Sequence, residues 1–270
     1  MKNLVVGNTS QLSRYFPEDY IKISSRNIDV NFLKQTKWDN IYLCFAEQRT
    51  YLANSSDQSV AELFWSINYN KTKELIEELQ PVCDKIVYYS SAELWNKCNG
   101  PIKIGMPFLY HENHYTSSKC KISEELSDKL KYPKVSIVYP FNFNSVYRGD
   151  QYLFGKVFKS IKENKKISIG DTDYYRELLH PKMVVDGSIH LTELGKDVII
   201  GSGRLVHIGD FIRKLYEFCK LNYNELVEQT NIQPSVYRSN IFYSAQFTYE
   251  FTEDFLLDII VRELQKGDLS

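Results

Sequence analysis

Residues 2–13 read KNLVVGNTSQLS, an apolar run followed by a glycine and several small polar residues. Its apolar run LVV predicts a short buried strand that leads directly into Gly7. The segment Gly7–Ser13 has the spacing of a G-x-x-G-x-x-G turn, with Ser10 and Ser13 in place of the second and third glycines. Such turns open a helix whose N-terminus faces a dinucleotide pyrophosphate. Taken alone, the stretch fits either a dinucleotide-binding unit or an ordinary strand–turn–helix junction.

Short apolar runs alternate with helical stretches along the rest of the chain. Further strands are expected at Tyr20–Ser24, Asn40–Ala46, Lys85–Tyr89, Val135–Tyr139 and Asp197–Gly201. Helices are expected around Gln11–Phe16, Val60–Leu79, Tyr115–Leu130 and Ile208–Cys219. This alternation predicts an α/β fold with a parallel sheet covered on both faces. In such sheets, ligands bind beyond the carboxyl ends of the strands.

Composition narrows the class of protein. The chain has 270 residues, 33 Lys+Arg, 34 Asp+Glu and a net charge of −1. This balance argues against nucleic acid or an anionic membrane as the main partner. No apolar run approaches the roughly 20 residues that span a bilayer. Five cysteines without a CxxC pair argue against a disulfide framework or a metal site. We therefore expect a reducing compartment, most simply the cytoplasm.

Several residues at predicted strand ends are candidates for dinucleotide binding. The second strand ends in Ser24-Ser25-Arg26, without the carboxylate that usually holds the adenosine ribose of NAD. Two hydroxyls and a guanidinium favour a 2′-phosphate and hence NADP, with NAD possible and an ordinary polar loop as the alternative. The other candidates are Gly7, Ser10, Gln11, Leu12 and Ser13 in the turn, Asp29 and Val30 near the adenine, Phe45 and Ala46 in the cleft, and Asn70 as a supporting residue.

The most informative motif is Tyr115-Thr116-Ser117-Ser118-Lys119, a Y-x-x-x-K. On a helix, residues four apart share a face. A nearby ammonium stabilises tyrosinate and lowers the tyrosine pKa, which makes Tyr115 a usable acid or base. Ser91 follows a predicted strand, and a hydroxyl in that position can hydrogen-bond the reacting oxygen. A solvated helix face is the alternative for the Tyr/Lys pair.

In this order, the motifs resemble those of the extended short-chain dehydrogenase/reductases that modify nucleotide sugars. GNTSQLS (7–13) resembles the G-x-T-G-Q-L-G turn of dTDP-4-dehydrorhamnose reductases, and SSAELWNK (90–97) resembles T-S-E-L-Y-G-K of GDP-mannose 4,6-dehydratases. Similar matches occur in SRNIDV (25–30), FNFNSVYRG (141–149), IGDTDYYRELLHPKMVV (169–185) and IIGSGRLVHIGDFI (199–212). Where the family pattern has Arg-Asp, this chain has Arg176-Glu177.

The resemblance implies a Rossmann-type, doubly wound domain over 1–140 with a return segment at about 184–218. It implies a small substrate-binding lobe from 141–183 and 219–270. Tyr115 is then the acid/base, and Ser91 binds the sugar C4 oxygen. Lys119 holds the nicotinamide ribose, so that Tyr115 and Lys119 are both cofactor-binding residues as well. The substrate side would be contacted by Asn142, Arg148 and Arg176. Family members commonly form homodimers through two helices, so a homodimer is a further expectation.

By the resemblance, Glu93 would remove the C5 proton of the sugar in a 4,6-dehydratase, but some reductases and related decarboxylases also carry Glu at this place, so Glu93 fits more than one reaction. We expect an NADP-dependent reductase acting at C4 of a nucleotide-diphosphate 4-keto-6-deoxy sugar, in the synthesis of surface-polysaccharide precursors. The alternative is a 4,6-dehydratase or 4-epimerase that recycles its cofactor, with Glu93 or Tyr115 as base. A third possibility, from another class, is a degenerate member that binds a nucleotide, a sugar or a protein partner without catalysis.

Overall fold

The computed structural model describes residues 2–109, 113–192, 194–230, 242–244 and 252–266. The chain forms two compact units. Unit 1 consists of Met1–Trp95, Ile104–Pro140 and Val185–Ile200, and unit 2 of Asn96–Lys103, Phe141–Val184 and Gly201–Ser270. The return segment of unit 1 therefore ends at Ile200 instead of about residue 218. The helix after it packs with unit 2, because α7 (Ile208–Phe218) lies against α9 (Glu253–Gln265).

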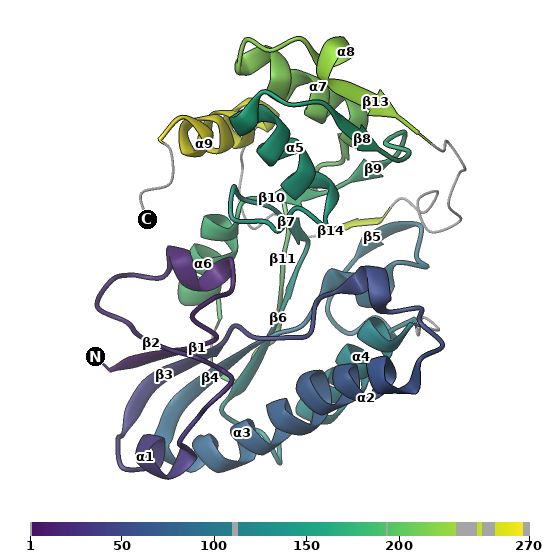
Figure 1. The fold of residues 1–270 in the computed structure, drawn as a ribbon. Coiled ribbons are helices and arrows are strands. Elements are labelled where there is room, and N and C mark those ends of the chain that lie inside the picture. The colour runs from purple at the N-terminus through teal and green to yellow at the C-terminus, as the bar shows by residue number, and fades with distance from the viewer. Residues whose placement is uncertain (1, 110–112, 193, 231–241, 245–251, 267–270) are drawn as a thin grey trace. The chain divides into compact units, whose positions relative to one another are not determined.

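A six-stranded parallel sheet forms the centre of unit 1 (Figure 1). Its order is β11 (Val198–Ile200), β6 (Val135–Pro140), β4 (Cys83–Tyr89), β3 (Trp38–Leu43), β1 (Asn3–Val6) and β2 (Ile21–Ile23). All of β1 and β6 is buried, as expected for strands covered on both faces. This confirms the predicted α/β class. β2 lies on one side of β1, and β3 lies on the other side. The direction in which successive strands are added to the sheet therefore reverses between β1 and β3.

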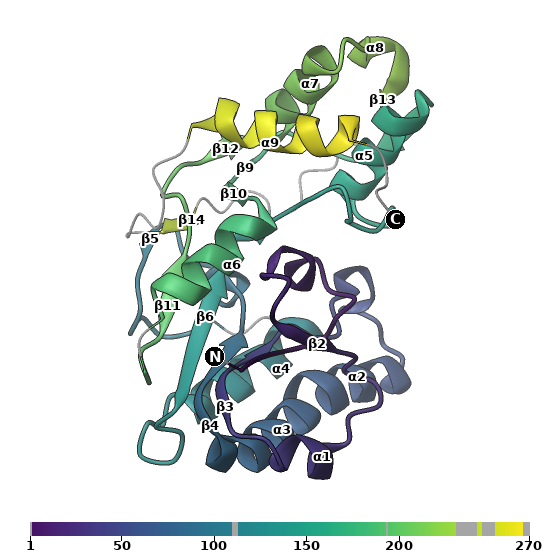
Figure 2. The ribbon, with the colours of Figure 1, turned by 90° about the vertical axis from the view of Figure 1, so that its left-hand side faces the viewer.

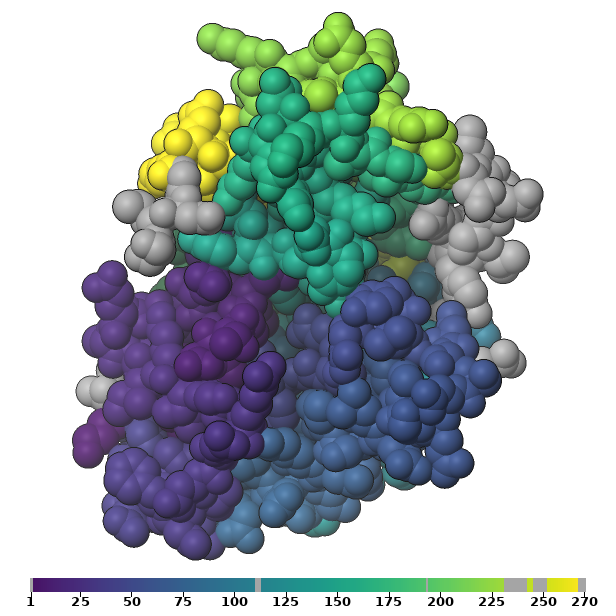
Figure 3. All heavy atoms as spheres, viewed as in Figure 1, coloured from purple at the N-terminus to yellow at the C-terminus, as the bar shows by residue number. Residues whose placement is uncertain are grey.

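Helices cover one face of this sheet in a continuous layer (Figures 1 and 2). They are α1 (Val30–Lys34), α4 (His114–Leu126) and a rod made of α2 (Gln58–Trp65), the π-helix η3 (Ser66–Lys71) and α3 (Thr72–Leu79). The face of unit 1 seen in Figure 3 is mostly coloured purple to blue, so early parts of the chain build most of it. Asp57 and Asn113 cap α2 and α4 by accepting hydrogen bonds from Ser59 N and Thr116 N.

The connection from β1 to β2 contains a short helix where one is expected, in the tighter 3-10 form. Only a four-residue 3-10 helix, η1 (Leu12–Tyr15), forms between these strands. Phe16 already has extended backbone angles, because the residue before a proline is disfavoured in the helical region. The other 3-10 segments are η2 (Thr50–Leu52), η4 (Gln80–Val82) and η5 (Ala92–Trp95).

Unit 2 is assembled from short segments around one buried carboxylate. Its two-stranded pairings join β10 (Leu178–Leu179) with β7 (Asn142–Phe143), β12 (Val206–His207) with β9 (Tyr175–Arg176), β13 (Val227–Gln229) with β8 (Ile167–Ile169), and β14 (Phe242–Ser244) with β5 (Gly100–Ile102). Its remaining helices are α5 (Leu153–Glu163), α8 (Tyr223–Leu226) and the first part of α6 (Pro181–His190). Fully buried Glu177 accepts hydrogen bonds from the N–H groups of Ser202, Gly203 and Ser244. In the described ranges, no helix has the length and apolar character needed to cross a membrane.

Gly7 lies where the chain leaves β1 and passes over the neighbouring strand exit. Its φ is +108°, a conformation that L side chains rarely adopt. A Cβ at Gly7 would also lie 3.0 Å from backbone atoms of Cys44 and Phe45. The glycine is therefore required by backbone conformation and by space.

Substitution of Gly7 by alanine is expected to lower the free energy of unfolding by about 2–4 kcal/mol, as positive φ and the backbone clash add. Gly105 also has positive φ but has nothing within 4 Å of its ideal Cβ. Gly105→Ala should therefore cost only about 1–2 kcal/mol. Urea unfolding of both variants measures the difference, and equal losses would contradict the close-approach argument.

Candidate functional site

The turn Gly7–Ser13 is held together by its own hydrogen bonds. The N–H groups of Gly7 and Asn8 donate to the Ile23 carbonyl, at 2.8 and 3.0 Å. The Ser13 hydroxyl lies 2.8 Å from the carbonyls of both Asn8 and Ser10. The Ser10 hydroxyl in turn accepts from Ser13 N at 3.1 Å. Both serines that replace glycines are therefore bonded within the turn, and Ser13 is fully buried.

The exit of β2 is polar and more open. Ser24 and Ser25 are half-buried and Arg26 is exposed, with Arg26 N donating to the Ser24 hydroxyl at 3.1 Å. Asp29 is the N-cap of α1, where its Oδ1 accepts from Phe32 N at 3.0 Å, and Val30 is the first residue of that helix. The segment thus supplies two hydroxyls and one guanidinium. Its carboxylate, Asp29, already accepts a hydrogen bond as the N-cap of α1.

The exit of β3 is fastened to the π-helix by one buried asparagine. Asn68 Oδ1 accepts from Glu47 N at 2.7 Å, and Asn68 Nδ2 donates to the Glu47 carbonyl at 3.2 Å. The same Nδ2 lies 3.2 Å from the Ser118 hydroxyl of α4. Asn70, the asparagine expected from the sequence, is exposed. The residue that supports this region is therefore Asn68, which shares the buried face of the rod with Phe64 and Thr72 at intervals of four residues.

The loop that contains Phe45 and Ala46 continues into two further contacts of this kind. Phe45 is buried and Ala46 half-buried. Arg49 pairs with Glu47 through two nitrogens, at 2.9 and 2.7 Å, and this pairing lowers the Glu47 pKa against the opposing effect of burial. Further along, His114 N donates to the Ala53 carbonyl at 2.9 Å. The loop after β3 is thereby tied to the first turn of α4.

One face of α4 is directed at the carboxyl end of β4. Tyr115, Lys119 and Ser123 follow at intervals of four residues, so they share that face. Lys119 Nζ donates to the Tyr89 carbonyl at 2.7 Å, and the Ser123 hydroxyl bonds the Ser90 hydroxyl at 2.7 Å. Tyr115 lies one turn further towards the N-terminus of the helix. Two contacts thus fix the helix that carries the Tyr/Lys pair.

Lys119 has an unusual environment for a lysine. It is 2% exposed, and its Nζ lies 4.6 Å from the centre of the Tyr88 ring. Burial lowers the Lys119 pKa to about 7. Burial, followed by the neighbouring Tyr115, raises the pKa of Tyr88. Tyr88, Tyr115 and Lys119 therefore form one cluster, in which the lysine changes charge near neutral pH.

The exit of β4 carries the predicted serine and glutamate. Ser91 is buried, and its hydroxyl accepts from Glu93 N at 3.1 Å. Glu93 is half-buried and lies in η5. That short helix is anchored by fully buried Trp95, whose ring lies 5.0 Å from the ring of Tyr139. Ser91 and Glu93 follow directly on the segment that Lys119 and Ser123 contact.

The three substrate-side candidates lie in unit 2. Asn142 is in β7, paired with Leu178. The Arg148 guanidinium is stacked 3.8 Å from the centre of the Tyr152 ring. Arg176 is 8% exposed and donates to the Tyr175 carbonyl at 2.8 Å. Both guanidinium groups are thus held by aromatic or backbone neighbours, which reduces their side-chain freedom.

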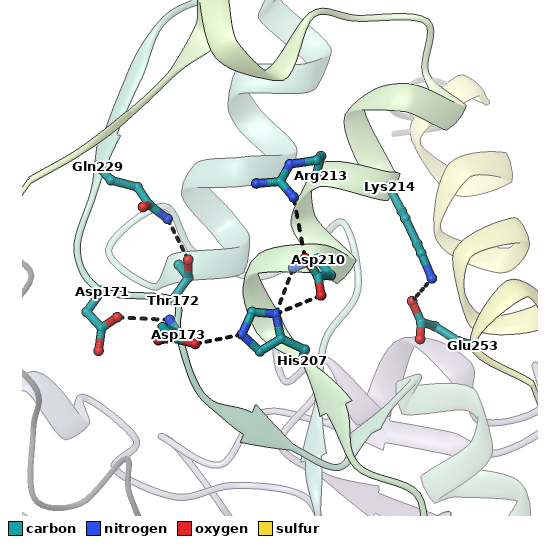
Figure 4. A network of polar contacts seen from close by, with 9 residues as sticks. All are labelled: Asp171, Thr172, Asp173, His207, Asp210, Arg213, Lys214, Gln229 and Glu253. Carbon is teal, nitrogen blue, oxygen red and sulfur yellow. Dashed lines mark hydrogen bonds and ion pairs between the residues drawn. The ribbon is translucent and has the colours of Figure 1, made fainter.

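A polar network in unit 2 escaped the sequence reasoning (Figure 4). His207, at the start of α7, lies 3.0 Å from Asp173 through Nε2 and 3.0 Å from Asp210 through Nδ1. Figure 4 also shows Gln229 donating to Thr172, at 2.6 Å. These contacts fasten the loop that precedes Arg176. The signal available in the sequence was the spacing of His207 and Asp210, which is that of a helix cap.

The donors of unit 1 fit a dinucleotide, although the turn offers few of them. The hydroxyls of Ser10 and Ser13 bond within the turn, so backbone groups on its outer side are left to bind a ligand. Ser24, Ser25 and Arg26 suit an adenosine phosphate, and Lys119 and Tyr115 suit a ribose and a carbonyl oxygen. Within the described residues, no group of three or more His, Cys, Asp or Glu is arranged to hold a metal ion. His111 is not among the described residues, so this statement does not include it.

Comparison with solved structures identifies the fold. RMD from Pseudomonas aeruginosa, complexed with NADPH, superimposes with a TM-score of 0.79 at 15% identity, covering 98% of this chain and 100% of that one. UDP-glucuronic acid 4-epimerase from Bacillus cereus, complexed with UDP-glucuronic acid and NAD, gives 0.79 at 15%, covering 98% and 99%. dTDP-glucose 4,6-dehydratase from Bacillus anthracis, with NAD, gives 0.77 at 16%, covering 99% and 97%.

These likenesses confirm the predicted Rossmann-type architecture with a second, smaller part. No family model matches the chain, and no curated protein matches it. The fold is therefore shared with these proteins, at a sequence identity of 15–16%.

Replacement of Asn68 by alanine should lower the free energy of unfolding by about 2–4 kcal/mol, because Glu47 N–H would be left buried without a partner. Asn70→Ala, two residues away on the exposed side, should change stability by less than about 0.5 kcal/mol. Thermal and urea unfolding compare the two variants. A larger loss for Asn70→Ala would show that the assignment of the two asparagines is reversed.

Substitution of Lys119 by methionine is expected to stabilise the protein near neutral pH. The pKa of Lys119 in the fold, about 7, lies below its ordinary value of 10.5. Folding therefore carries the full cost of the buried charge at and below pH 7, and that cost disappears as pH rises towards 10.5. We expect a gain of about 1–3 kcal/mol at pH 6.5 that shrinks steadily by pH 9.5. Exposed Lys121 provides the control, and an equal, pH-independent effect of Lys121→Met would contradict this reasoning.

Proposed function

We propose that the protein is an NAD(P)-dependent oxidoreductase that modifies a nucleotide-diphosphate sugar, and that it reduces the C4 keto group of an NDP-4-keto-6-deoxy sugar. The observation that carries this proposal is the α4 face, on which Tyr115 and buried Lys119 share one cluster with Tyr88, beside the β4 exit that bears Ser91. A module that only binds ligands has no need of a buried lysine beside a phenol. The fold shared with an NADPH complex and with a UDP-glucuronic acid 4-epimerase supports the broader part of this proposal, an NAD(P)-dependent enzyme of nucleotide sugars.

Each residue of this face has a chemical task in the proposed reaction. The dinucleotide, when bound, supplies the hydride that is added to the keto carbon. Tyr115 donates a proton to the oxygen of that carbon, so the ketone becomes an alcohol. Ser91 donates a hydrogen bond that holds the oxygen in place, and protonated Lys119 stabilises the tyrosinate that remains. Water then returns the proton to Tyr115.

The residues at the β2 exit support a proposal for the identity of the dinucleotide. We propose NADP, because Ser24, Ser25 and Arg26 offer hydroxyls and a guanidinium, and because the one nearby carboxylate, Asp29, caps α1. Solved proteins of the same fold are complexed with NADPH in one case and with NAD in others. Comparison of NADPH with NADH in the same binding assay separates the two.

A second candidate reaction is kept because of Glu93. It is half-buried and follows Ser91 by two residues, where a carboxylate can remove a proton from the sugar ring. A 4,6-dehydratase or 4-epimerase would recycle its dinucleotide, whereas a reductase consumes NADPH stoichiometrically. Net loss of NADPH absorbance per sugar converted distinguishes these reactions.

The proposals for substrate binding, location, oligomeric state and biological role rest on the resemblance to nucleotide-sugar enzymes. We propose that Asn142, Arg148 and Arg176 bind the nucleotide-diphosphate sugar, since a guanidinium binds two phosphate oxygens at once. We also propose a cytoplasmic location, a homodimer, and a role in making surface-polysaccharide precursors. Light scattering of the purified protein measures its oligomeric state directly.

Tyr115→Phe should reduce turnover of a 4-keto sugar nucleotide by at least about 100-fold, because the proton donor is removed while the ring and its packing stay. The affinity for NADPH, measured by fluorescence titration, should remain within about twofold. Tyr69→Phe, on the neighbouring helical rod, serves as a control for loss of a phenol elsewhere. An unchanged rate in Tyr115→Phe would reject the role of Tyr115, and absence of NADPH and NADH binding at millimolar concentration would reject the proposed function.

A further inference from the structure

We infer that Ser10 and Ser13 weaken the binding of the dinucleotide. The dinucleotide then enters and leaves in each catalytic cycle as a co-substrate, instead of staying bound through many turnovers. The inference rests on the proposed function and concerns the same site. It follows from how the turn between β1 and η1 satisfies its own donors.

Four backbone donors of the turn are already paired, two with β2 and two within the turn. Gly7 N and Asn8 N donate to the Ile23 carbonyl, and Ser10 N donates to the Gly7 carbonyl at 3.0 Å. Ser13 N, which lies in the first turn of η1, donates to the Ser10 hydroxyl at 3.1 Å. With glycine at position 10, this last N–H would have no side-chain acceptor and would be available to a phosphate oxygen. The serine therefore removes one donor from the phosphate cradle.

The second serine closes the turn from the other side. The Ser13 hydroxyl lies 2.8 Å from both the Asn8 and the Ser10 carbonyls, and the side chain is fully buried. With glycine at position 13, the same backbone would carry no such brace. The Ser13 hydroxyl thus holds the turn in its closed form through two carbonyls, while the donor withheld from the ligand is the Ser13 N–H that the Ser10 hydroxyl accepts.

The helix that follows contributes little to compensate. A Rossmann turn gains affinity for a pyrophosphate from the aligned peptide dipoles of a long helix. Here η1 has four residues, Leu12–Tyr15, and Phe16 is already extended. So short a 3-10 segment has no macrodipole of comparable size. Weak retention of the dinucleotide is the consequence.

Exchange of the dinucleotide favours one class among the candidate reactions. Reduction of a ketone consumes one hydride and one proton, so the reduced dinucleotide must enter and the oxidised form must leave in every cycle. Epimerisation and dehydration return the hydride to the sugar, so they need the same dinucleotide to stay bound. Loose binding at Ser10 and Ser13 therefore supports reduction.

The first measurement uses the purified full-length protein. Its content of NAD(H) and NADP(H) is determined by mass spectrometry after acid release, and NADPH affinity is determined by fluorescence titration. We expect well below one equivalent of retained dinucleotide, with saturable binding of added NADPH. About one equivalent retained after dialysis would overturn the inference while leaving the proposed function intact.

The second measurement restores the glycines. The double variant Ser10→Gly/Ser13→Gly should bind NADPH about tenfold more tightly, the effect of one recovered charge-assisted hydrogen bond. Ser10→Ala/Ser13→Ala is the matched control: it frees the Ser13 N–H but keeps both Cβ atoms, so tightening in both variants assigns the effect to the hydroxyls. Unchanged or weaker NADPH binding in both folded variants, checked by circular dichroism, would overturn the inference. Absence of NADPH and NADH binding in every form would instead reject the proposed function.

Discussion

The buried carboxamide of Asn68 fixes the geometry on which the candidate site depends. It bonds both the N–H and the carbonyl of Glu47 and also reaches the Ser118 hydroxyl, so one side chain joins the β3 exit, the π-helix and α4. Such a group is costly to bury unless its donors and acceptors are matched, and here they are. Because α4 also meets the end of β4 through Lys119 and Ser123, the position of Tyr115 is set from two directions.

The sheet of unit 1 was predictable because its strands are short, nearly continuous apolar runs, which burial on both faces demands. The Tyr115/Lys119 pair was predictable from spacing, since helix geometry places residues four apart together. Asn70 stays a prediction for the cofactor site, and it is exposed. In INYNKT both asparagines are chemically equivalent, and Asn68 is the one that lies four residues from buried Phe64 and from buried Thr72, on the buried face of the helical rod.

Other features could not be read from the sequence because they arise from contacts between distant segments. The low pKa of Lys119 results from complete burial beneath Tyr88 and Tyr89, which no local pattern reveals. Unit 2 is built from strands of two or three residues, too short to show a period. Its segments are brought together by Glu177 and by the contacts of His207. Because Glu177 bonds Ser202 shortly after Ile200, the chain joins unit 2 from that point, earlier than expected.

The order of the strands has a consequence for how the protein is made. The edge strand β11 (Val198–Ile200) is encoded after the Phe141–Val184 part of unit 2, yet it pairs with β6 (Val135–Pro140). While the ribosome synthesises the intervening stretch, the outer edge of β6 has no strand beside it, and open edges of this kind invite pairing with other chains. The nascent polypeptide must therefore keep an unfinished sheet from aggregating until the last strand emerges, which makes this interval the one in which chaperones have most to protect.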